Sequence, residues 1–306
     1  MPISIKKPRP VSAGAVFHPG RCLRDSDQRR SAPAKPAGSA PSSVNAPVSK
    51  KPPRFQNLYR LFTLILTMAD HIRTALVTGG SKGIGYGVAE ALIKSGVKVA
   101  ITSRSQASAD EAAAKLNQIR GGYALGMAAD VRDLASQQRV VDQIVGQWER
   151  LDYVIANAGV GHFAPIQDLT PEQWHETIDI NLTGVFNSIK ASLSELKKTE
   201  GYFISIASLA GTNFFEKASA YNASKFGLVG FTQAIMLDLR AEGIKVSTIM
   251  PGSVATEFAD HTPSDADAWK IQPEDIGKLV IDLLSMHPRT LPSKIEVRPT
   301  IPGGKK

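Results

Sequence analysis

Three side chains between Ser208 and Lys225 have the types and spacing needed to transfer a proton to a carbonyl oxygen. Tyr221 and Lys225 are four residues apart in a stretch, Ala218 to Arg240, with helical spacing of apolar residues and no proline. Residues at this spacing share one helix face, ~6 Å apart along the axis. A nearby ammonium lowers the pKa of a phenol, which predicts Tyr221 as an acid–base group. Ser208 follows the strand-like run Tyr202 to Ala207, so its hydroxyl is placed to hold the carbonyl oxygen.

Tyrosine and lysine are common at this spacing in helices, so the neighbouring motifs decide the interpretation. The apolar run Ile72 to Thr78 leads into a glycine-rich turn, and a helical pattern follows from Ile84 to Ser95. Strand, glycine turn and helix together place a phosphate on a helix N-terminus. Three glycines permit a tight turn, close backbone approach and close helix–strand packing. The motif predicts a dinucleotide site at Gly79, Ser81, Lys82, Gly83, Ile84 and Gly85.

The residue after the second predicted strand, Val97 to Ser103, bears on the choice of cofactor. An acid near this point suits the ribose 2′-hydroxyl of NAD, whereas this chain has Arg104, which suits a 2′-phosphate. Lys82 in the glycine turn adds a second positive charge. We therefore expect NADP(H) to be preferred over NAD(H).

Strands and helices are predicted to alternate along the rest of the chain. Strands separated by helices of ten or more residues indicate a parallel sheet covered by helices on both faces. The fold class is therefore α/β, a doubly wound parallel sheet of Rossmann type, in one domain over residues 68–306. Further strands are expected at 123–129, 151–156, 202–207, 245–250 and 295–298, and helices at 106–120, 133–149, 171–198, 218–240 and 274–286, with Asp133 near the start of one and Thr170 capping the long one.

Charge is distributed unevenly along the 306 residues, which carry a formal net charge of +8. Residues 1–67 hold 12 Lys/Arg and 2 Asp/Glu, and the remainder holds 24 and 26. The main body therefore gives no argument for a nucleic-acid partner. Its lack of cysteine, with only Cys22 in the chain, excludes disulfides and thiolate chemistry there.

Residues 1–67 form a basic, Pro- and Ser-rich extension that we expect to be disordered. It is a disordered tail, a transit peptide, or the product of too early a start codon with Met68 as the true first residue. The apolar patch between Phe55 and Leu66 is too short for a membrane span. We expect a cytoplasmic protein, or organelle import if the extension is a transit peptide.

Several motifs in fixed order resemble those of the short-chain dehydrogenase/reductase family over nearly all of residues 70–300. They are Thr78-Gly-x-x-x-Gly83-x-Gly85, Asp130, Asn157-Ala-Gly, Asn181, Ser208, Tyr221-x-x-x-Lys225 and Pro251-Gly252. Ser208 and Tyr221 are separated by thirteen residues, the usual interval in that family. Each motif is weak alone, and the whole set in register is specific.

The resemblance implies an NADP(H)-dependent carbonyl reductase, reversibly an alcohol dehydrogenase. Tyr221 would be the general acid, and Ser208 would bind the substrate oxygen. Lys225 would lower the pKa of Tyr221 and bind the nicotinamide ribose, while Asn181 would hold a water that relays protons to Lys225. Further cofactor contacts would come from Asp130, Val131, Asn157, Ala158, Gly159, Pro251, Gly252, Val254 and Thr256.

The segments expected to set substrate specificity are 160–166, 209–217 and 255–272. The segment between Pro251 and Pro273 is short, so a small lid is expected. The C-terminal end differs from that of acyl-carrier-protein reductases and is more like that of small ketone or 3-hydroxy-acid reductases. A partly apolar pocket for a small carbonyl or alcohol substrate is predicted, with candidate lining residues His162, His261, Phe214, Phe215, Phe258 and Trp269.

Other interpretations stay open at this point. The spacing of His162, His175 and His261 fits no metal motif. The same fold could serve a non-catalytic nucleotide sensor, or an epimerase or dehydratase with the same four catalytic residues. A homodimer or homotetramer is expected, since the helix bearing Trp174 and Phe186 pairs with its copy in relatives; these two side chains are either core or subunit contacts.

Overall fold

The computed structural model describes residues 72–301, and the predicted extension of residues 1–67 lies outside them. Seven parallel strands form one sheet in the order β3-β2-β1-β4-β5-β6-β7, which confirms the predicted fold class. The strands are β1 Thr74–Val77, β2 Lys98–Ser103, β3 Ala124–Ala128, β4 Tyr153–Ala156, β5 Tyr202–Ile206, β6 Lys245–Pro251 and β7 Lys294–Val297. The helices are α2 Gly83–Lys94, α3 Gln106–Ile119, α4 Leu134–Trp148, α5 Pro171–Ile178, α6 Gly184–Thr199, α7 Ser219–Leu239 and α8 Pro273–Ser285.

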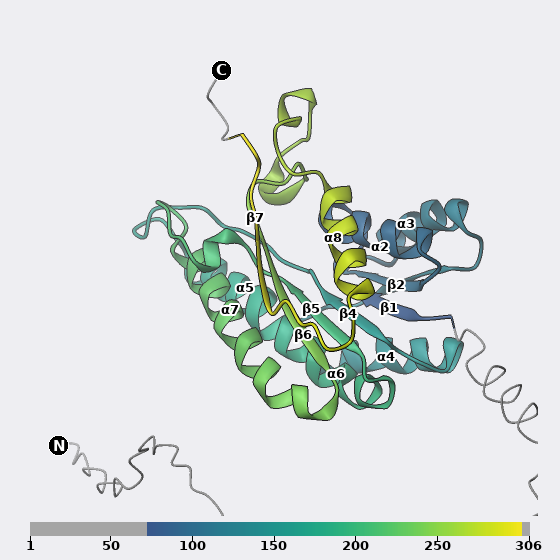
Figure 1. Ribbon diagram of the computed structural model, residues 1–306. Coiled ribbons are helices and arrows are strands. Elements are labelled where there is room, and N and C mark those ends of the chain that lie inside the picture. The colour runs from purple at the N-terminus through teal and green to yellow at the C-terminus, as the bar shows by residue number, and fades with distance from the viewer. Residues whose placement is uncertain (1–71, 302–306) are drawn as a thin grey trace, which may run out of the picture. The chain divides into compact units, whose positions relative to one another are not determined.

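The central strands are apolar along their whole length because helices cover both faces of the sheet. Every residue of β1 and β5 is buried. One hydrophobic core joins the sheet to α2, α3 and α8, and a second joins it to α4, α6 and α7. Figure 1 shows the two sets of helices on opposite sides of the strands.

Helices α2 and α8 approach each other closely because each contributes a glycine to the contact. A Cβ on Gly87 would lie 2.7 Å from the carbonyl oxygen of Pro273. A Cβ on Gly277 would lie 2.6 Å from the carbonyl oxygen of Gly87. Neither position has room for a side chain, so the two backbones meet directly and hold α8 beside the glycine turn that precedes α2 (Figure 1).

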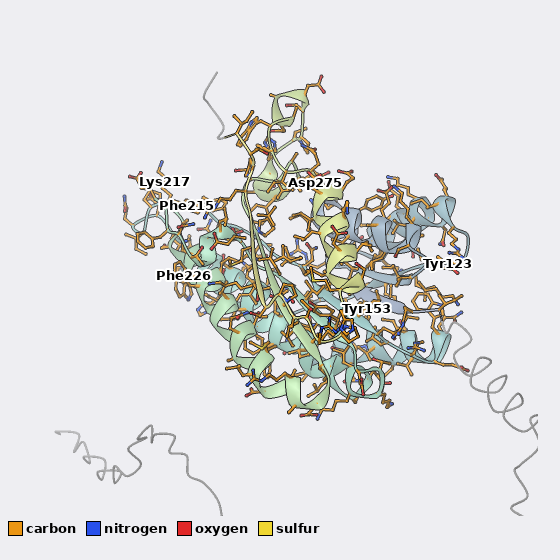
Figure 2. All side chains as sticks on the ribbon, in the orientation of Figure 1. Tyr123, Tyr153, Phe215, Lys217, Phe226 and Asp275 are labelled. Carbon is orange, nitrogen blue, oxygen red and sulfur yellow. The ribbon has the colours of Figure 1, made fainter. Side chains whose placement is uncertain are left out.

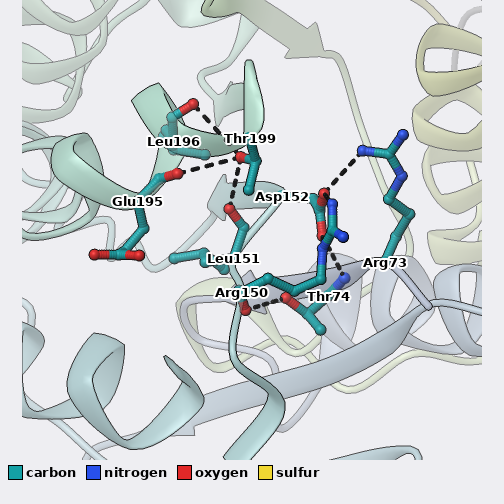
Figure 3. A network of polar contacts seen from close by, with 8 residues as sticks. All are labelled: Arg73, Thr74, Arg150, Leu151, Asp152, Glu195, Leu196 and Thr199. Atoms are coloured by element: carbon teal, nitrogen blue, oxygen red, sulfur yellow. Dashed lines mark hydrogen bonds and ion pairs between the residues drawn. The ribbon is translucent and has the colours of Figure 1, made fainter. Parts of the chain in front are cut away.

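A buried carboxylate fastens the strand ends opposite the predicted site (Figure 3). Asp152 is fully buried and accepts hydrogen bonds from the backbone N–H of Thr74 and from the guanidinium groups of Arg73 and Arg150. The Thr74 hydroxyl donates to the carbonyl oxygen of Arg150 at 2.6 Å. These contacts join the start of β1 to the start of β4 and satisfy a charge that burial would otherwise penalise.

The prediction of one continuous helix over 171–198 is wrong. It begins as predicted, with the Thr170 side chain accepting from the N–H of Gln173 in a capping box. A π-helical turn at Asp179–Thr183 then separates α5 from α6. A π-turn leaves an extra residue in the helix, and such turns occur often at functional sites. Asp133 caps α4 as expected, accepting from the N–H of Ala135.

Two aromatic side chains on these helices do not join the core. Trp174 on α5 and Phe186 on α6 are 39% and 43% exposed. The prediction that these two side chains belong to the core is therefore wrong. Their part in a subunit contact stays a prediction. Within residues 72–301, no helix is long and apolar enough to cross a membrane.

Candidate active site

A cavity of about 900 Å³ opens at the carboxyl ends of the strands. It is lined by residues that follow β1, β2, β3, β4, β5 and β6, together with α7 and the segment before α8. In open α/β sheets this edge is where ligands bind. All predicted cofactor residues except Gly85 line this cavity. Ser208, Tyr221 and Lys225 line it as well.

The glycine turn has the conformation that its sequence predicts. Gly79 and Gly83 have left-handed φ values of 63° and 54°, which favour glycine. A Cβ on Gly85 would lie 2.4 Å from Nδ2 of Asn157, so Gly85 serves close packing and does not face the cavity. The N-cap of α2, Lys82, makes no side-chain cap, and the first turn has no acidic residue. The first backbone N–H groups of α2 are therefore placed to receive an anion.

The ends of β1 and β4 are joined beneath this turn by two side chains. The hydroxyl of Thr78 accepts from the backbone N–H groups of Asn157 and Ala158 at 3.0 and 3.2 Å. Nδ2 of Asn157 donates to the carbonyl oxygens of Thr78 and Gly79, both at 3.0 Å. These bonds fix the glycine turn against the Asn-Ala-Gly segment. The sequence motif includes Thr78, but its spacing alone does not reveal this role.

Positive charge gathers beside the ends of β2 and β3. The side chains of Lys82 and Arg104 line the cavity, and that of Arg104 is 66% exposed. Nη1 of Arg104 lies 3.6 Å from Oε1 of Glu176, a loose ion pair. Arg132, which the sequence analysis missed, donates to both oxygens of Asp130 at 3.0 Å through Nε. Hydrogen bonds from Arg132 hold the pKa of the Asp130 carboxyl below its usual range, so Asp130 is ionised.

Tyr221, Ser208 and Lys225 line the same cavity. Tyr221 and Lys225 are one turn apart on α7, and Ser208 follows β5. The Ser208 hydroxyl is near enough to affect the Tyr221 pKa, and it accepts from the N–H of Ala210 at 3.1 Å. Nζ of Lys225 donates to the carbonyl oxygen of Ile206 at 3.2 Å. A phenol, a hydroxyl and an ammonium thus face one space, as the spacing predicts.

The prediction that the Tyr221 pKa is lowered is wrong for the protein without a bound ligand. Burial raises the pKa of the phenol, and the Ser208 hydroxyl lowers it to a lesser extent. Nζ of Lys225 lies 5.7 Å from the centre of the Tyr221 ring and is directed at a backbone carbonyl. Burial also lowers the pKa of Lys225 from 10.5 to about 8. Helical spacing predicts that the two side chains are neighbours, but their desolvation depends on the tertiary fold.

Asn181 lies in the π-helical turn and is fully buried, so its side chain does not line the cavity. Oδ1 accepts from the N–H of Val160 at 2.8 Å, and Nδ2 donates to the carbonyl oxygen of Val160 and to the hydroxyl of Ser224. The side chain therefore fastens the loop after β4 to α7. The water relay assigned to Asn181 stays a prediction.

The predicted pocket residues separate into two groups. Phe215, Phe258, Trp269 and His261 line the cavity. Phe214 does not and is 84% exposed. His162 is also wrong as a lining residue, because it lies outside the cavity, where Nε2 is 2.9 Å from Oε2 of Glu176.

Phe163 is an aromatic residue that the sequence analysis missed. Its ring centre lies 5.4 Å from that of Tyr221 in an edge-on arrangement. It stands in the loop after β4, where no periodicity indicates the direction of a side chain. The signal in the sequence is its position in the predicted specificity segment 160–166, four residues after the Asn-Ala-Gly motif.

A buried carboxylate organises the short segment before α8. Oδ1 and Oδ2 of Asp267 lie 2.6 Å from Nζ of Lys270 and 2.7 Å from Nε2 of His261. Oδ2 also accepts from the N–H of Ser264 at 3.0 Å. The bonds from Lys270 and His261 hold the Asp267 pKa well below its usual range. Within residues 72–301, no three His, Cys, Asp or Glu side chains gather closely enough to hold a metal ion.

Comparison with known proteins agrees with this geometry. Residues 73–267 match the model of the family described as short chain dehydrogenase. The chain belongs to the short chain dehydrogenase family. It is therefore an oxidoreductase of that type, with a Rossmann nucleotide-binding fold.

Members of the family with differing activities are similar to the chain. It is 36% identical to D-threitol dehydrogenase of Mycolicibacterium smegmatis over 187 residues, 61% of this chain and 72% of that protein. It is 31% identical to the 3-oxoacyl-acyl-carrier-protein reductase FabG of Escherichia coli over 208 residues, 68% and 84% of the two chains. The structure of an alcohol dehydrogenase from Thermococcus sibiricus complexed with 5-hydroxy-NADP superposes with a TM-score of 0.72 at 25% identity, covering 77% of this chain and all of that one.

Proposed function

We propose that the domain over residues 68–306 is an NADP(H)-dependent carbonyl reductase, reversibly an alcohol dehydrogenase. The observation that carries the proposal is that Tyr221, Ser208 and Lys225 share one cavity with the glycine turn. The residues present fit a dinucleotide, because the uncapped start of α2 offers N–H donors and Lys82 and Arg104 offer charge to phosphate. A bound reduced nicotinamide supplies the hydride.

The protein's own groups would handle the oxygen of the substrate. The Ser208 hydroxyl holds the carbonyl oxygen beside Tyr221, which polarises the carbonyl bond. Burial raises the Tyr221 pKa, so the phenol carries its proton at neutral pH. That protonation state is the one needed to give a proton to the oxygen as hydride reaches the carbon. The buried cation of Lys225 beneath the ring then stabilises the phenolate that forms.

Tyr221→Phe tests the assignment of the general acid. We expect turnover of a ketone panel with NADPH to fall at least 100-fold, since general acid catalysis contributes roughly 10²–10⁴-fold. NADPH affinity, followed by fluorescence titration, should stay within about twofold. Tyr123→Phe is the matched control, because it removes a phenol hydroxyl outside the cavity (Figure 2) and keeps the ring beneath Arg120. Unchanged turnover in Tyr221→Phe would refute the mechanism.

The preference for NADP(H) rests on Arg104. Arg104→Asp places an acid where a 2′-phosphate would lie, so the ratio of kcat/KM with NADPH to that with NADH should fall at least tenfold. Steady-state kinetics with both cofactors give this ratio. A wild-type enzyme that already favours NADH would contradict the assignment. We also propose a homodimer or homotetramer, in which the exposed Trp174 and Phe186 contribute to subunit contacts.

A further inference from the structure

Three phenylalanine rings form what we call the aromatic wall: Phe163 and Phe258 pack against the ring of Tyr221, and Phe215 packs against Phe163. The ring centres of Phe163 and Phe258 lie 5.4 and 5.7 Å from that of Tyr221, and 6.3 Å from each other. Phe215 lies 6.0 Å from Phe163. The rings come from three separate segments that the fold brings to one place, namely those after β4, before α7 and after β6.

The aromatic wall is far more exposed than the tyrosine beside it. Phe163, Phe215 and Phe258 are 42%, 53% and 37% exposed, whereas Tyr221 is 9% exposed. Phe215 and Phe258 line the cavity, as does Trp269, which is 38% exposed. Aromatic surface gathered in one concave place and left open to water is typical of a ligand site. A substrate that covers these rings gains the free energy of removing them from water.

The wall depends on a glycine between the rings. A Cβ on Gly161 would lie 2.7 Å from Cζ of Phe258 and 2.9 Å from Cε2 and Cζ of Phe163. Both rings therefore rest on the backbone of the loop after β4.

Two of the cations that line the cavity, Lys270 and Arg298, already have acidic partners. Nζ of Lys270 lies 2.6 Å from Asp267, and Arg298 donates to Glu296 at 2.9 Å. A carboxylate or phosphate on the substrate would have to displace one of these acids. The site beside Tyr221 thus favours a substrate that is neutral around its carbonyl.

The polar groups around the phenol suit one oxygen. Ser208 and Tyr221 line the same cavity, and their hydroxyls would both be directed at the carbonyl. A polyol leaves several further hydroxyls without partners against the aromatic wall, and each buried unpaired hydroxyl costs binding free energy.

We propose that the substrate is a neutral ketone or aldehyde whose carbonyl carries a flat aromatic ring, held edge-on or offset against the aromatic wall. The inference rests on the proposed reductase function and specifies its substrate class. In the reaction, hydride from NADPH forms the new C–H bond and Tyr221 gives its proton to the oxygen. An aryl ketone, NADPH and a proton from solvent thus become the secondary alcohol and NADP⁺. Offset and edge-on ring contacts of this kind favour aromatic ligands over aliphatic ones of similar area.

The test compares three neutral ketones as substrates of the full chain with NADPH: acetophenone, 2-butanone and the polyhydroxy ketone erythrulose. We expect kcat/KM to be highest for acetophenone. In Phe163→Ala and Phe258→Ala we expect kcat/KM for acetophenone to fall about tenfold, or ~1.4 kcal/mol, and that for 2-butanone to fall less than threefold. Phe214→Ala is the matched control, since its ring is 84% exposed outside the cavity and its loss should change neither value.

The outcomes separate this inference from the proposed function. If the wild-type enzyme reduces erythrulose or 2-butanone better than acetophenone, the aryl assignment is wrong and the reductase function stands. Equal losses for acetophenone and 2-butanone in Phe163→Ala also overturn it, because the wall would then shape the site without recognising a ring. If none of the three is reduced with NADPH or NADH and Tyr221→Phe changes nothing on a wider carbonyl panel, the proposed function itself fails.

Discussion

Lys225→Met should make the protein more stable while it abolishes activity. Lys225 is 4% exposed, and burial lowers its pKa from 10.5 to about 8. One unit of pKa corresponds to 1.36 kcal/mol, so the buried ammonium costs ~3 kcal/mol of folding free energy at neutral pH. Methionine has a similar length and no charge. It loses the hydrogen bond to the carbonyl oxygen of Ile206, worth ~1 kcal/mol, which leaves a net gain of ~2 kcal/mol.

The stability that Lys225→Met gains depends on pH. Because the folded-state pKa of Lys225 is lowered, its cost is present in full below about pH 8. As pH rises from there towards 10.5, the folded protein releases the proton before the unfolded chain does, and the cost disappears. Between pH 7 and pH 9.5 the advantage of Lys225→Met should shrink by ~2 kcal/mol and come close to zero.

Thermal unfolding followed by circular dichroism without cofactor measures both effects. At pH 7 the Tm of Lys225→Met should lie ~4–8 °C above that of the wild type, and at pH 9.5 the two should nearly coincide. Lys190→Met is the control, because Lys190 is an exposed lysine on α6 whose loss should change stability by less than ~0.5 kcal/mol. The reasoning would be refuted if Lys225→Met were less stable than the wild type at pH 7, or if the difference in Tm did not change with pH.

Two further predictions concern the scaffold and are checked by urea unfolding. Gly277→Ala should destabilise the protein by ~1–3 kcal/mol, because its Cβ would lie 2.6 Å from the carbonyl oxygen of Gly87. The control is Gly146→Ala, in the exposed part of α4, where a Cβ has no atom within 4 Å. This substitution should stabilise the protein by ~0.5–1 kcal/mol. A loss of stability in both variants would contradict the packing argument. Asp152→Ala should cost ~3 kcal/mol, since it leaves the buried N–H of Thr74 unpaired and two arginines without their anion. A cost below ~1 kcal/mol would show that water replaces the carboxylate.

Much of the fold could be predicted because the sheet is buried on both faces. Strands such as Tyr202–Ile206 have continuous apolar runs, and the helices between them are amphipathic, so type and order follow from local pattern. The break at Asp179–Thr183 could not be predicted, because no proline interrupts the helical pattern there. The turn instead coincides with a tertiary contact, the pairing of buried Asn181 with Val160. Sequence periodicity contains no information about that partner.

The candidate site shows the same division. The residues that could be predicted lie at the ends of strands or on α7, where the fold determines their direction, as with Ser208 and Tyr221. Phe163 lies in a loop and Asp267 ends a single 3-10 turn, so their positions depend on contacts with segments far along the chain or on a local hydrogen-bond network. Side chains in loops follow no regular spacing, so the sequence does not show in which direction they point. The residues that we propose to set specificity therefore lie in the part of the sequence that is hardest to interpret.

The position of the loop after β4 connects these two parts of the site. Asn181 fastens this loop from the π-helical turn, and Thr78 fastens its start from the end of β1. The same loop carries Gly161, on whose backbone the rings of Phe163 and Phe258 rest. The contact that holds the cofactor side of the cavity thus also positions the aromatic wall beside Tyr221. A change at Asn181 should therefore disturb substrate selection together with turnover, although its side chain does not line the cavity.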